Sequence, residues 1–273
     1  MPDPAPRYRP PAVIRASVAL HLGAAAAVVV RPHTWPWALS AVVADHLLLT
    51  AAGLWPRSSL LGSNWTHLPQ AFAPPASVAI TIDDGPDPEV TPRVLDLLDE
   101  RGARATFFCI GERVLQHPVL AREITRRGHA MENHSQRHLH RFSLLGPAGM
   151  ATEITRAQHS ISDTTGQIAR FFRAPAGLRN PFLAAVLARA QLQLASWTRR
   201  GFDTRNGNSD AVLARLTRNL AAGDILLLHD GHAAVTNAGS PVILTVLPRL
   251  LAAVAAAGLK PVTLRAALPP SVP

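Results

Sequence analysis

Cysteines, aromatic residues and lysines are scarce in this sequence, and the first two shortages each count against a class of protein. The single cysteine, Cys109, excludes an internal disulfide and a cysteine-rich metal centre. It lies in the apolar run 105–110, so we expect a buried structural thiol. Aromatic residues make up only 5% of the chain and the basic residues form no clustered stripe, which counts against a nucleic-acid partner.

Arginine supplies nearly all of the positive charge. Lysine and arginine total 27 residues against 18 aspartates and glutamates, which gives a formal net charge of +9, and Lys260 is the only lysine. Scattered arginines are typical of solvated helix faces. They also suit an anionic partner, such as a membrane surface or a phosphate-bearing substrate, and both interpretations stay open.

Two long apolar runs occupy the first 56 residues. The runs 12–30 and 35–55 each approach the roughly 20 residues that a helix needs to cross a bilayer. Tryptophans lie at both ends of the second run, where indole rings favour the headgroup region. We therefore expect residues 1–56 to form a membrane-anchoring helical hairpin, followed by a linker at 57–75 that is rich in Pro, Ser, Gly and Asn.

Two other interpretations fit this hydrophobic region. The first run could be a signal peptide, because arginines precede it, although the second run argues against its removal. The second run could lie on the membrane or pack on the domain, because Asp45 and His46 are costly in lipid. Arginines at positions 7, 9 and 15 outnumber the one in the intervening loop. This asymmetry predicts anchoring in a bacterial-type inner membrane and favours the cytoplasmic face for the domain that follows.

From residue 76 onward, short apolar runs alternate with longer amphipathic ones. The pattern predicts strands near 77–82, 104–109, 128–132, 169–173, 192–197, 224–228 and 259–263. Helices are expected at 92–101, 113–127, 147–165, 181–190, 211–222 and 241–257. This alternation is typical of a parallel α/β protein, either a barrel or an open doubly wound sheet. Glycines 102, 128, 223 and 258 stand between a helix and the next strand, where a left-handed cap is useful.

Polar residues directly follow several of the predicted strands. They are Asp83, Asp84, His134, His138, Arg173 and His229. Barrel enzymes assemble their sites where the carboxyl ends of the strands meet. We therefore expect these side chains to converge, although they are spread over about 150 positions.

Asp83 and Asp84 are suited to two different roles. Successive side chains on a strand alternate in direction, so one carboxylate can bind a metal while the other faces an attacking water. Asp87, a few residues later, is expected only to cap a helix that begins at Pro88.

His134 and His138 are four residues apart, which is about one helical turn, so both imidazoles can reach a single ion. Such a pair alone is weak evidence for a metal site. Here it follows a predicted strand, and a carboxylate pair occupies the equivalent place on the first strand, which strengthens the prediction. His140 is a further candidate ligand, and the pair is preferred to it.

His229 and Arg173 complete the candidate site. A histidine at the edge of an apolar strand can donate a proton near neutral pH, and a hydrogen-bonded core histidine is the alternative. Arg173 precedes Pro175 and Gly177 and could hold a carboxylate ionised through a two-pronged pair. The alternative is an arginine that is paired on the surface.

Together these segments resemble successive motifs of the polysaccharide deacetylases, the NodB-homology or carbohydrate esterase family 4 group. The motifs are TIDDGP at 81–86, HSQRH at 134–138, RAPAG at 173–177 and LLLHD at 226–230. The resemblance covers about residues 76 to 266 and preserves the order of the family's motifs. It implies a catalytic domain over residues 76–268 that folds as a distorted (β/α) barrel of about seven parallel strands, preceded here by the hydrophobic hairpin.

The resemblance also implies roles for individual residues. Asp83 would be the general base, and the ligands of a divalent metal, usually zinc, would be Asp84, His134 and His138. Arg173 would orient Asp83.

Further roles concern the substrate. His229 would protonate the leaving amine, the backbone N–H near Ala176 would help to hold the oxyanion, and Leu227 would contact the substrate.

The chain departs from the family pattern mainly in one motif, which commonly reads Asp-x-x-Asp-Trp. Here Asp203 supplies one aspartate, while Asn206 and Gly207 replace the Asp-Trp end. Asp203 is the best candidate for tuning His229. Without that tryptophan the acyl pocket is undefined, so a formyl or another small acyl group is conceivable.

The expected function is hydrolysis of a carbon–nitrogen bond other than a peptide bond, by metal-dependent deacetylation of an N-acylated amino sugar. An envelope polysaccharide or lipid-linked glycan is the expected partner, because the anchor and the basic charge keep the site near a membrane. The incomplete motif around Asp203 leaves a catalytically silent carbohydrate-binding protein as one alternative. A metal-dependent ester or phosphoester hydrolase is the other.

Overall fold

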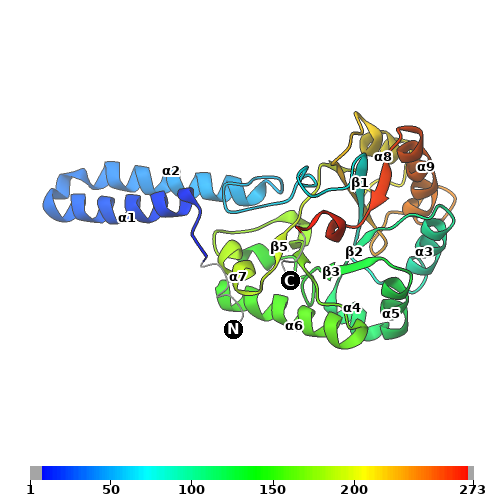
Figure 1. Ribbon diagram of the computed structural model, residues 1–273. Helices are drawn as coiled ribbons and strands as arrows, with labels where there is room; N and C mark the ends of the chain where they lie inside the picture. Colours follow the sequence, from blue (N-terminus) through cyan, green and yellow to red (C-terminus); the bar gives the residue numbers. More distant parts are fainter. Residues whose placement is uncertain (1–7, 270–273) are drawn as a thin grey trace.

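The computed structural model describes residues 8–269 and begins with a helical hairpin. Helix α1 (Ala12–Val30) and helix α2 (Trp35–Leu54) are joined by a short turn and project from one side of the α/β domain (Figure 1). Both are long and apolar enough to cross a membrane, a test that a signal sequence would also pass. The predicted hairpin is therefore present, whereas Arg7, which contributes to the predicted topology, lies outside the described residues.

The polar residues of the hairpin contact one another between the two helices. Ser17 Oγ donates a hydrogen bond of 2.6 Å to Asp45 Oδ2, and His21 Nε2 lies 3.2 Å from His46 Nε2. Such pairing lowers the cost of placing these groups in hydrocarbon.

The segment between the hairpin and the first strand packs against the domain. Leu61 and Leu68 are buried, and the Leu68 N–H donates to the carbonyl of Gly223 at 2.8 Å. Trp65 forms a parallel bridge with Ala195. The hairpin is thus connected to the domain by an ordered segment with its own backbone pairing.

The strands form one parallel sheet that curls into an open barrel. They are β1 Ser77–Asp83, β2 Thr106–Cys109, β3 Ala130–Asn133, β4 Phe171–Phe172, β5 Gln193–Leu194, β6 Arg199–Arg200, β7 Ile225–His229 and β8 Lys260–Val262. Their order is β5-β4-β3-β2-β1-β7-β6, and β8 pairs with the beginning of β1. This order follows the chain around the barrel and leaves it open between β5 and β6, which confirms the predicted distorted barrel.

Helices connect most of the strands. They are α3 Thr91–Asp99, α4 Gly111–Gln116, α5 Pro118–Arg126, α6 Pro147–Thr165, α7 Leu183–Arg189, α8 Ser209–Thr217 and α9 Val242–Ala256. The four glycines predicted to end helices all have positive φ, as expected.

Three local features differ from the prediction. The helix predicted over 113–127 is two helices, because Pro118 lacks the N–H that would continue α4 and begins α5 instead. Helix α8 starts earlier than predicted, because the side chain of Asn208 caps it by accepting from the Ala211 N–H. Strand β6 was not predicted, since its two arginines give no apolar signal.

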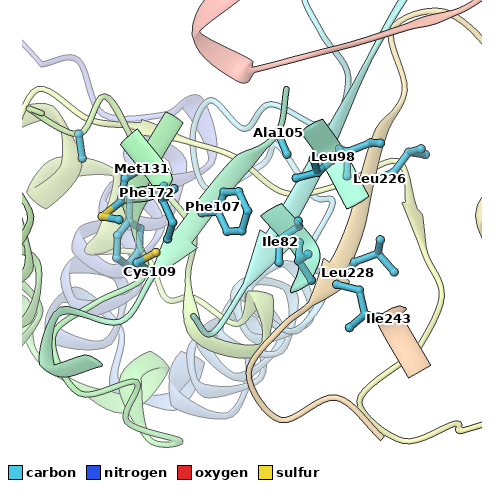
Figure 2. Packing of buried hydrophobic residues seen from close by; sticks show 14 of the residues in the cluster. Ile82, Leu98, Ala105, Phe107, Cys109, Met131, Phe172, Leu226, Leu228 and Ile243 are labelled. Atoms are coloured by element: carbon cyan, nitrogen blue, oxygen red, sulfur yellow. The ribbon is translucent and has the colours of Figure 1, made fainter. Parts of the chain in front are cut away.

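Side-chain alternation along the strands builds two apolar layers. The outer layer fills the space between the sheet and helices such as α3 and α9, and Figure 2 shows Phe107, Leu226 and Leu98 within it. The inner layer includes Phe108 and Leu227 and fills the barrel itself. Because residues two apart share a face, the inner face carries polar side chains toward the carboxyl ends of the strands. The single cysteine lies in the outer layer and is fully buried, as predicted.

Candidate metal centre and active site

The ends of β1 and β7 meet at the candidate site. Asp83 is the last residue of β1, and the parallel register places it beside His229, the last residue of β7, and beside Phe108 of β2. Arg173 follows β4 by one residue and is buried. The structure therefore brings together the residues that the sequence predicts at strand ends.

Asp84, His134 and His138 form a compact cluster with one candidate ligand atom each. These three atoms lie within 4.8 Å of one another, and Asp84 Oδ1 is 3.3 Å from the Nε2 atom of each histidine. Within residues 8–269, Asp84 Oδ1 is buried without a hydrogen-bond donor. A buried carboxylate oxygen that faces two imidazole nitrogens fits a divalent cation bound by one oxygen and two nitrogen ligands.

Local backbone geometry brings the two histidines together. The predicted helical turn is absent, because residues 134–138 form a tight loop in which Ser135 and His138 have positive φ. Ser135 Oγ accepts a hydrogen bond from the His138 N–H at 3.0 Å. His134 Nδ1 lies 2.8 Å from the carbonyl oxygen of Arg173. A proton on Nδ1 would be donated to that carbonyl, which leaves Nε2 directed at Asp84.

Two residues that the sequence reasoning missed hold Asp84 from the other side. His232 Nδ1 lies 3.3 Å from Asp84 Oδ2. Arg113 donates from Nη1 to the backbone carbonyl of Asp84 at 2.9 Å, and its Nη2 lies 3.2 Å from His232 Nε2. His232 closely follows the end of β7, so its position near a strand end could have marked it as a candidate site residue. Arg113 lies inside a helix, and no feature of the sequence marked it.

The environment of the cluster sets the protonation of its members. Burial alone would raise the pKa of Asp84, but the neighbouring imidazoles of His134 and His232 outweigh it and hold that pKa well below its ordinary value. Burial lowers the pKa of His138 to about 4, so this imidazole is neutral at pH 7 and can bind a metal. Burial also disfavours a charged His134, but Asp83 and Asp84 together raise its pKa. A metal bound there would displace that proton.

Arg173 fixes the orientation of Asp83. Its Nη1 donates to Asp83 Oδ1 at 2.6 Å and to Thr81 Oγ1 at 2.8 Å. The rest of the guanidinium donates to the backbone carbonyls of Ala195 and Ser196 and stacks on Phe108, 4.1 Å from the ring centroid. Asp83 Oδ2 is then 3.8 Å from His134 Nε2, facing the three-residue cluster.

Asp203 contacts His229 at two atoms. Its Oδ1 is 2.9 Å from His229 Nδ1, and its Oδ2 accepts the His229 backbone N–H at 2.7 Å. Burial alone would lower the pKa of His229, but the hydrogen bond and the charge of Asp203 outweigh it and raise that pKa. The side chain of Asn206 instead accepts a hydrogen bond from the Asn208 N–H, so its oxygen is not directed at His229.

Asp230 anchors the loop that follows Asp84. The Thr91 hydroxyl donates to Asp230 Oδ2 and also accepts the Asp87 N–H at 2.7 Å. Burial raises the pKa of Asp230 to about 7. The expectation that Asp87 caps a helix beginning at Pro88 was wrong: its carboxylate accepts from the N–H groups of 89 and 90 in a turn, and α3 begins at Thr91.

A cavity of about 860 Å³ lies over these groups. Its lining includes the three residues of the cluster. The other candidate site residues in the lining are Asp83, His229, Ala176 and Leu227, and Trp197 also lines the cavity. Ala176 has a φ of 54° and belongs to the turn Pro175–Gly177, which contributes to the lining of this cavity. Trp197 was not singled out from the sequence, yet it provides an aromatic wall. His140 also lines the cavity, but it is outside the three-residue cluster and its ring centroid is 6.2 Å from that of His138.

Comparisons with known proteins agree with this geometry. The family described as polysaccharide deacetylase matches residues 72–195. A peptidoglycan-N-acetylglucosamine deacetylase of Bacillus cereus is 37% identical over 156 residues, which are 56% of this chain and 72% of that protein. A chitooligosaccharide deacetylase of Bradyrhizobium sp. is 35% identical over 157 residues, covering 57% and 71% of the two chains.

The structural comparison leads to the same group. The family 4 carbohydrate esterase of Streptomyces lividans, solved in complex with acetate, has a TM-score of 0.62 and is 33% identical. The match covers 69% of this chain and 93% of that one. The motifs, the open barrel and these relatives show that the chain belongs to the polysaccharide deacetylase family and carries its NodB-homology domain.

Proposed function

We propose that this protein is a metal-dependent deacetylase that hydrolyses the amide bond of an N-acetylated amino sugar. The observation that carries the proposal is that three groups line one cavity. They are the candidate metal-ligand cluster, Asp83 with its partner Arg173, and His229 with its partner Asp203. Water adds to the carbonyl carbon, the C–N bond breaks, and the products are acetate and the free amine. Three relatives support that reaction: two are deacetylases of a peptidoglycan and of chitooligosaccharides, and the third is a carbohydrate esterase solved in complex with acetate.

The cluster residues provide the metal site. Asp84, His134 and His138 would hold a divalent cation, for which we propose zinc because the donors are two imidazoles and one carboxylate. When bound, that ion supplies Lewis acidity toward the amide carbonyl and toward water.

Asp83 is proposed as the general base. Arg173 engages its Oδ1, which leaves Oδ2 beside the metal ligands to accept the proton of the attacking water. The Ala176 backbone N–H is proposed to donate to the developing oxyanion, in line with its place on the cavity wall.

His229 is proposed as the general acid. Asp203 engages Nδ1, so Nε2 is the nitrogen left to protonate the leaving amine. Leu227 and Trp197 both line this cavity and are proposed to contact the acyl methyl group. In this proposal Trp197 serves in place of the tryptophan that the family motif commonly carries.

Substituting Asp203 should change the pH dependence of the reaction. A general acid works in its protonated form, so activity falls as pH rises through the pKa of His229. The hydrogen bond that His229 Nδ1–H donates to Asp203 raises that pKa, and Asp203→Asn should therefore move the alkaline limb of kcat/KM to lower pH. We also expect about a tenfold loss at pH 7. An unchanged alkaline limb in a folded variant would contradict the role of this pair.

The class of bond can be tested directly. Purified, metal-loaded protein should release acetate from N-acetylglucosamine oligomers and should not release phosphate from a phosphomonoester. Phosphate release without acetate release would favour the phosphoesterase alternative. A folded, metal-loaded protein that binds the oligomer and releases neither would favour a silent binding protein.

The hairpin leads us to propose a substrate near a membrane. We assign residues 1–56 to the anchor, 57–75 to the connection and 76–268 to the catalytic domain. An anchor with an ordered connection holds the site close to the bilayer, and the net charge of +9 suits anionic neighbours. We therefore propose a lipid-linked or envelope glycan of a bacterial inner membrane as substrate.

The membrane side is predicted from the arginine distribution. Reporter fusions after Arg31 and after Pro74 should give opposite signals, with Pro74 on the cytoplasmic side. A cytoplasmic domain would act on a glycan before its export. A periplasmic signal at Pro74 would overturn this topology and would point to an exported envelope polymer as substrate.

A further inference from the structure

A second cavity lies where the hairpin meets the barrel. It has a volume of about 450 Å³, within the range of ligand pockets in proteins. In Figure 1, α7 lies below the base of the hairpin, and this helix forms one wall. The apolar part of the lining includes Leu61, Leu183, Leu187, Leu192 and Leu194, and the polar part includes Tyr8, Arg9 and Arg179.

Arg179 is a buried cation without a counter-charge in this part of the structure. The side chain belongs to a residue that is 5% exposed, and no carboxylate of residues 8–269 lies within 4 Å of its guanidinium. One Nη donates to the carbonyl of Ser58, while Nε is buried without an acceptor among the described residues. Burial lowers its pKa to about 10, so the group is still protonated at neutral pH. A buried unpaired charge is destabilising unless an anion occupies the space beside it.

The backbone around Arg179 is fixed against the hairpin. The Arg179 N–H donates to the carbonyl of Gly53 in α2 at 3.1 Å. A Cβ at Gly53 would clash with the Arg179 carbonyl oxygen, so glycine is needed for this close approach. Arg179 is therefore held at the end of α2, and Pro11, which precedes α1, lines the same cavity.

This position corresponds to one face of the membrane if the hairpin spans it. The first residue of α1 and the last residues of α2 lie at the same end of an antiparallel pair, so the cavity is level with the lipid headgroups. Its lining combines two arginines, Arg9 and Arg179, with five leucines.

We propose that this cavity binds a phosphate-bearing lipid of net negative charge, with the phosphate at Arg179 and Arg9 and the apolar chain along the leucines. Guanidinium groups match phosphate oxygens through charge-assisted, often two-pronged hydrogen bonds. The leucines remove part of the chain from water. Either a bilayer phospholipid or a lipid-linked sugar phosphate has this chemistry, and binding of either would hold the domain against the membrane surface. The proposal rests on the anchoring role proposed above.

The test uses the full chain in detergent micelles and measures retained lipid by native mass spectrometry. The probes are phosphatidylglycerol, phosphatidylcholine and inorganic phosphate at equal phosphate concentration. Wild-type protein should retain phosphatidylglycerol, and Arg179→Gln should weaken retention about tenfold. Arg189→Gln is the matched control, because Arg189 is an exposed arginine at the end of α7 and is not among the residues that line the cavity.

A second variant keeps the test decisive if Arg179→Gln does not fold. Ala188 is exposed and lines the cavity, so Ala188→Phe should fill the opening and block the lipid while keeping both arginines. Equal retention by wild type and Ala188→Phe would overturn the proposal, as would equal binding of phosphatidylcholine. Protection from unfolding by inorganic phosphate equal to that by the lipid would overturn the lipid part. A lipid-linked sugar phosphate that displaces phosphatidylglycerol would identify the sugar-bearing source.

Two parallel measurements separate this proposal from the earlier ones. Flotation with vesicles tests whether the hairpin anchors the chain. Acetate release from a soluble N-acetylglucosamine oligomer tests catalysis without a lipid. If the protein does not float with vesicles, the anchoring proposal fails. If it releases no acetate, the catalytic proposal fails. In both cases the lipid-retention measurement still decides whether the cavity binds a lipid.

Discussion

Asp83→Asn should retain its metal and lose almost all turnover. The asparagine keeps the size of the side chain but cannot accept the proton of the attacking water at neutral pH, and general base catalysis contributes about 10²- to 10⁴-fold. Asp83 is not part of the three-residue metal cluster, so metal content should stay near one ion per chain. The measurements are kcat on an N-acetylated glucosamine oligomer and elemental analysis of the same sample.

The Asp83→Asn variant needs a stability control, because Asp83 is the counter-ion of Arg173. Its guanidinium is buried and donates to Asp83 Oδ1 at 2.6 Å, so a neutral partner leaves a buried charge without its counter-ion. The variant should be destabilised, because breaking a buried pair at one side costs about 3–5 kcal/mol. Thermal unfolding would show whether the assayed sample is folded. Asp163→Asn, an exposed carboxylate on α6, serves as the matched control. Full activity of folded Asp83→Asn would refute its role as base.

His138→Ala should lose the metal itself. This substitution removes one of the three proposed metal ligands and exposes the buried Asp84 Oδ1, which faces the Nε2 atoms of both histidines. Loss of groups that merely orient ligands costs about 10- to 100-fold in metal affinity, so loss of a ligand should cost more than about 100-fold. Activity should fall in parallel and should recover partly at high metal concentration.

His140→Ala is the matched control for the metal prediction. Its ring centroid lies 6.2 Å from that of His138, and it lines the same cavity without belonging to the cluster. The control should keep its metal affinity. Equal losses of metal in the two variants would show that the ligand set is assigned incorrectly.

Strand ends made much of this site predictable from the sequence. An apolar run that ends in two carboxylates, as at Asp83, marks both a buried strand and the polar rim where parallel strands finish. The same reasoning located His134 and His229. The alternation of side chains then determines which of these residues face the interior of the barrel.

The missed features depend on tertiary contacts. His232 reaches Asp84 only because β7 lies next to β1, and Trp197 reaches the cavity from the segment that connects β5 to β6, the two edge strands of the open barrel. Loop conformation was equally inaccessible: the histidine spacing suggested a helical turn, whereas positive φ at Ser135 and His138 produces the same convergence. Local sequence patterns carry no information on such contacts between distant segments.

The most direct test is acetate release as a function of bound divalent metal. Full-length protein, stripped with a chelator and then titrated with zinc, should release acetate and free amine in equal amounts from an N-acetylglucosamine oligomer. Release should rise with metal content and reach its plateau near one ion per chain. A folded, fully metal-loaded protein that releases no acetate from any acetylated amino sugar, or release that is unchanged by removal of the metal, would contradict the account.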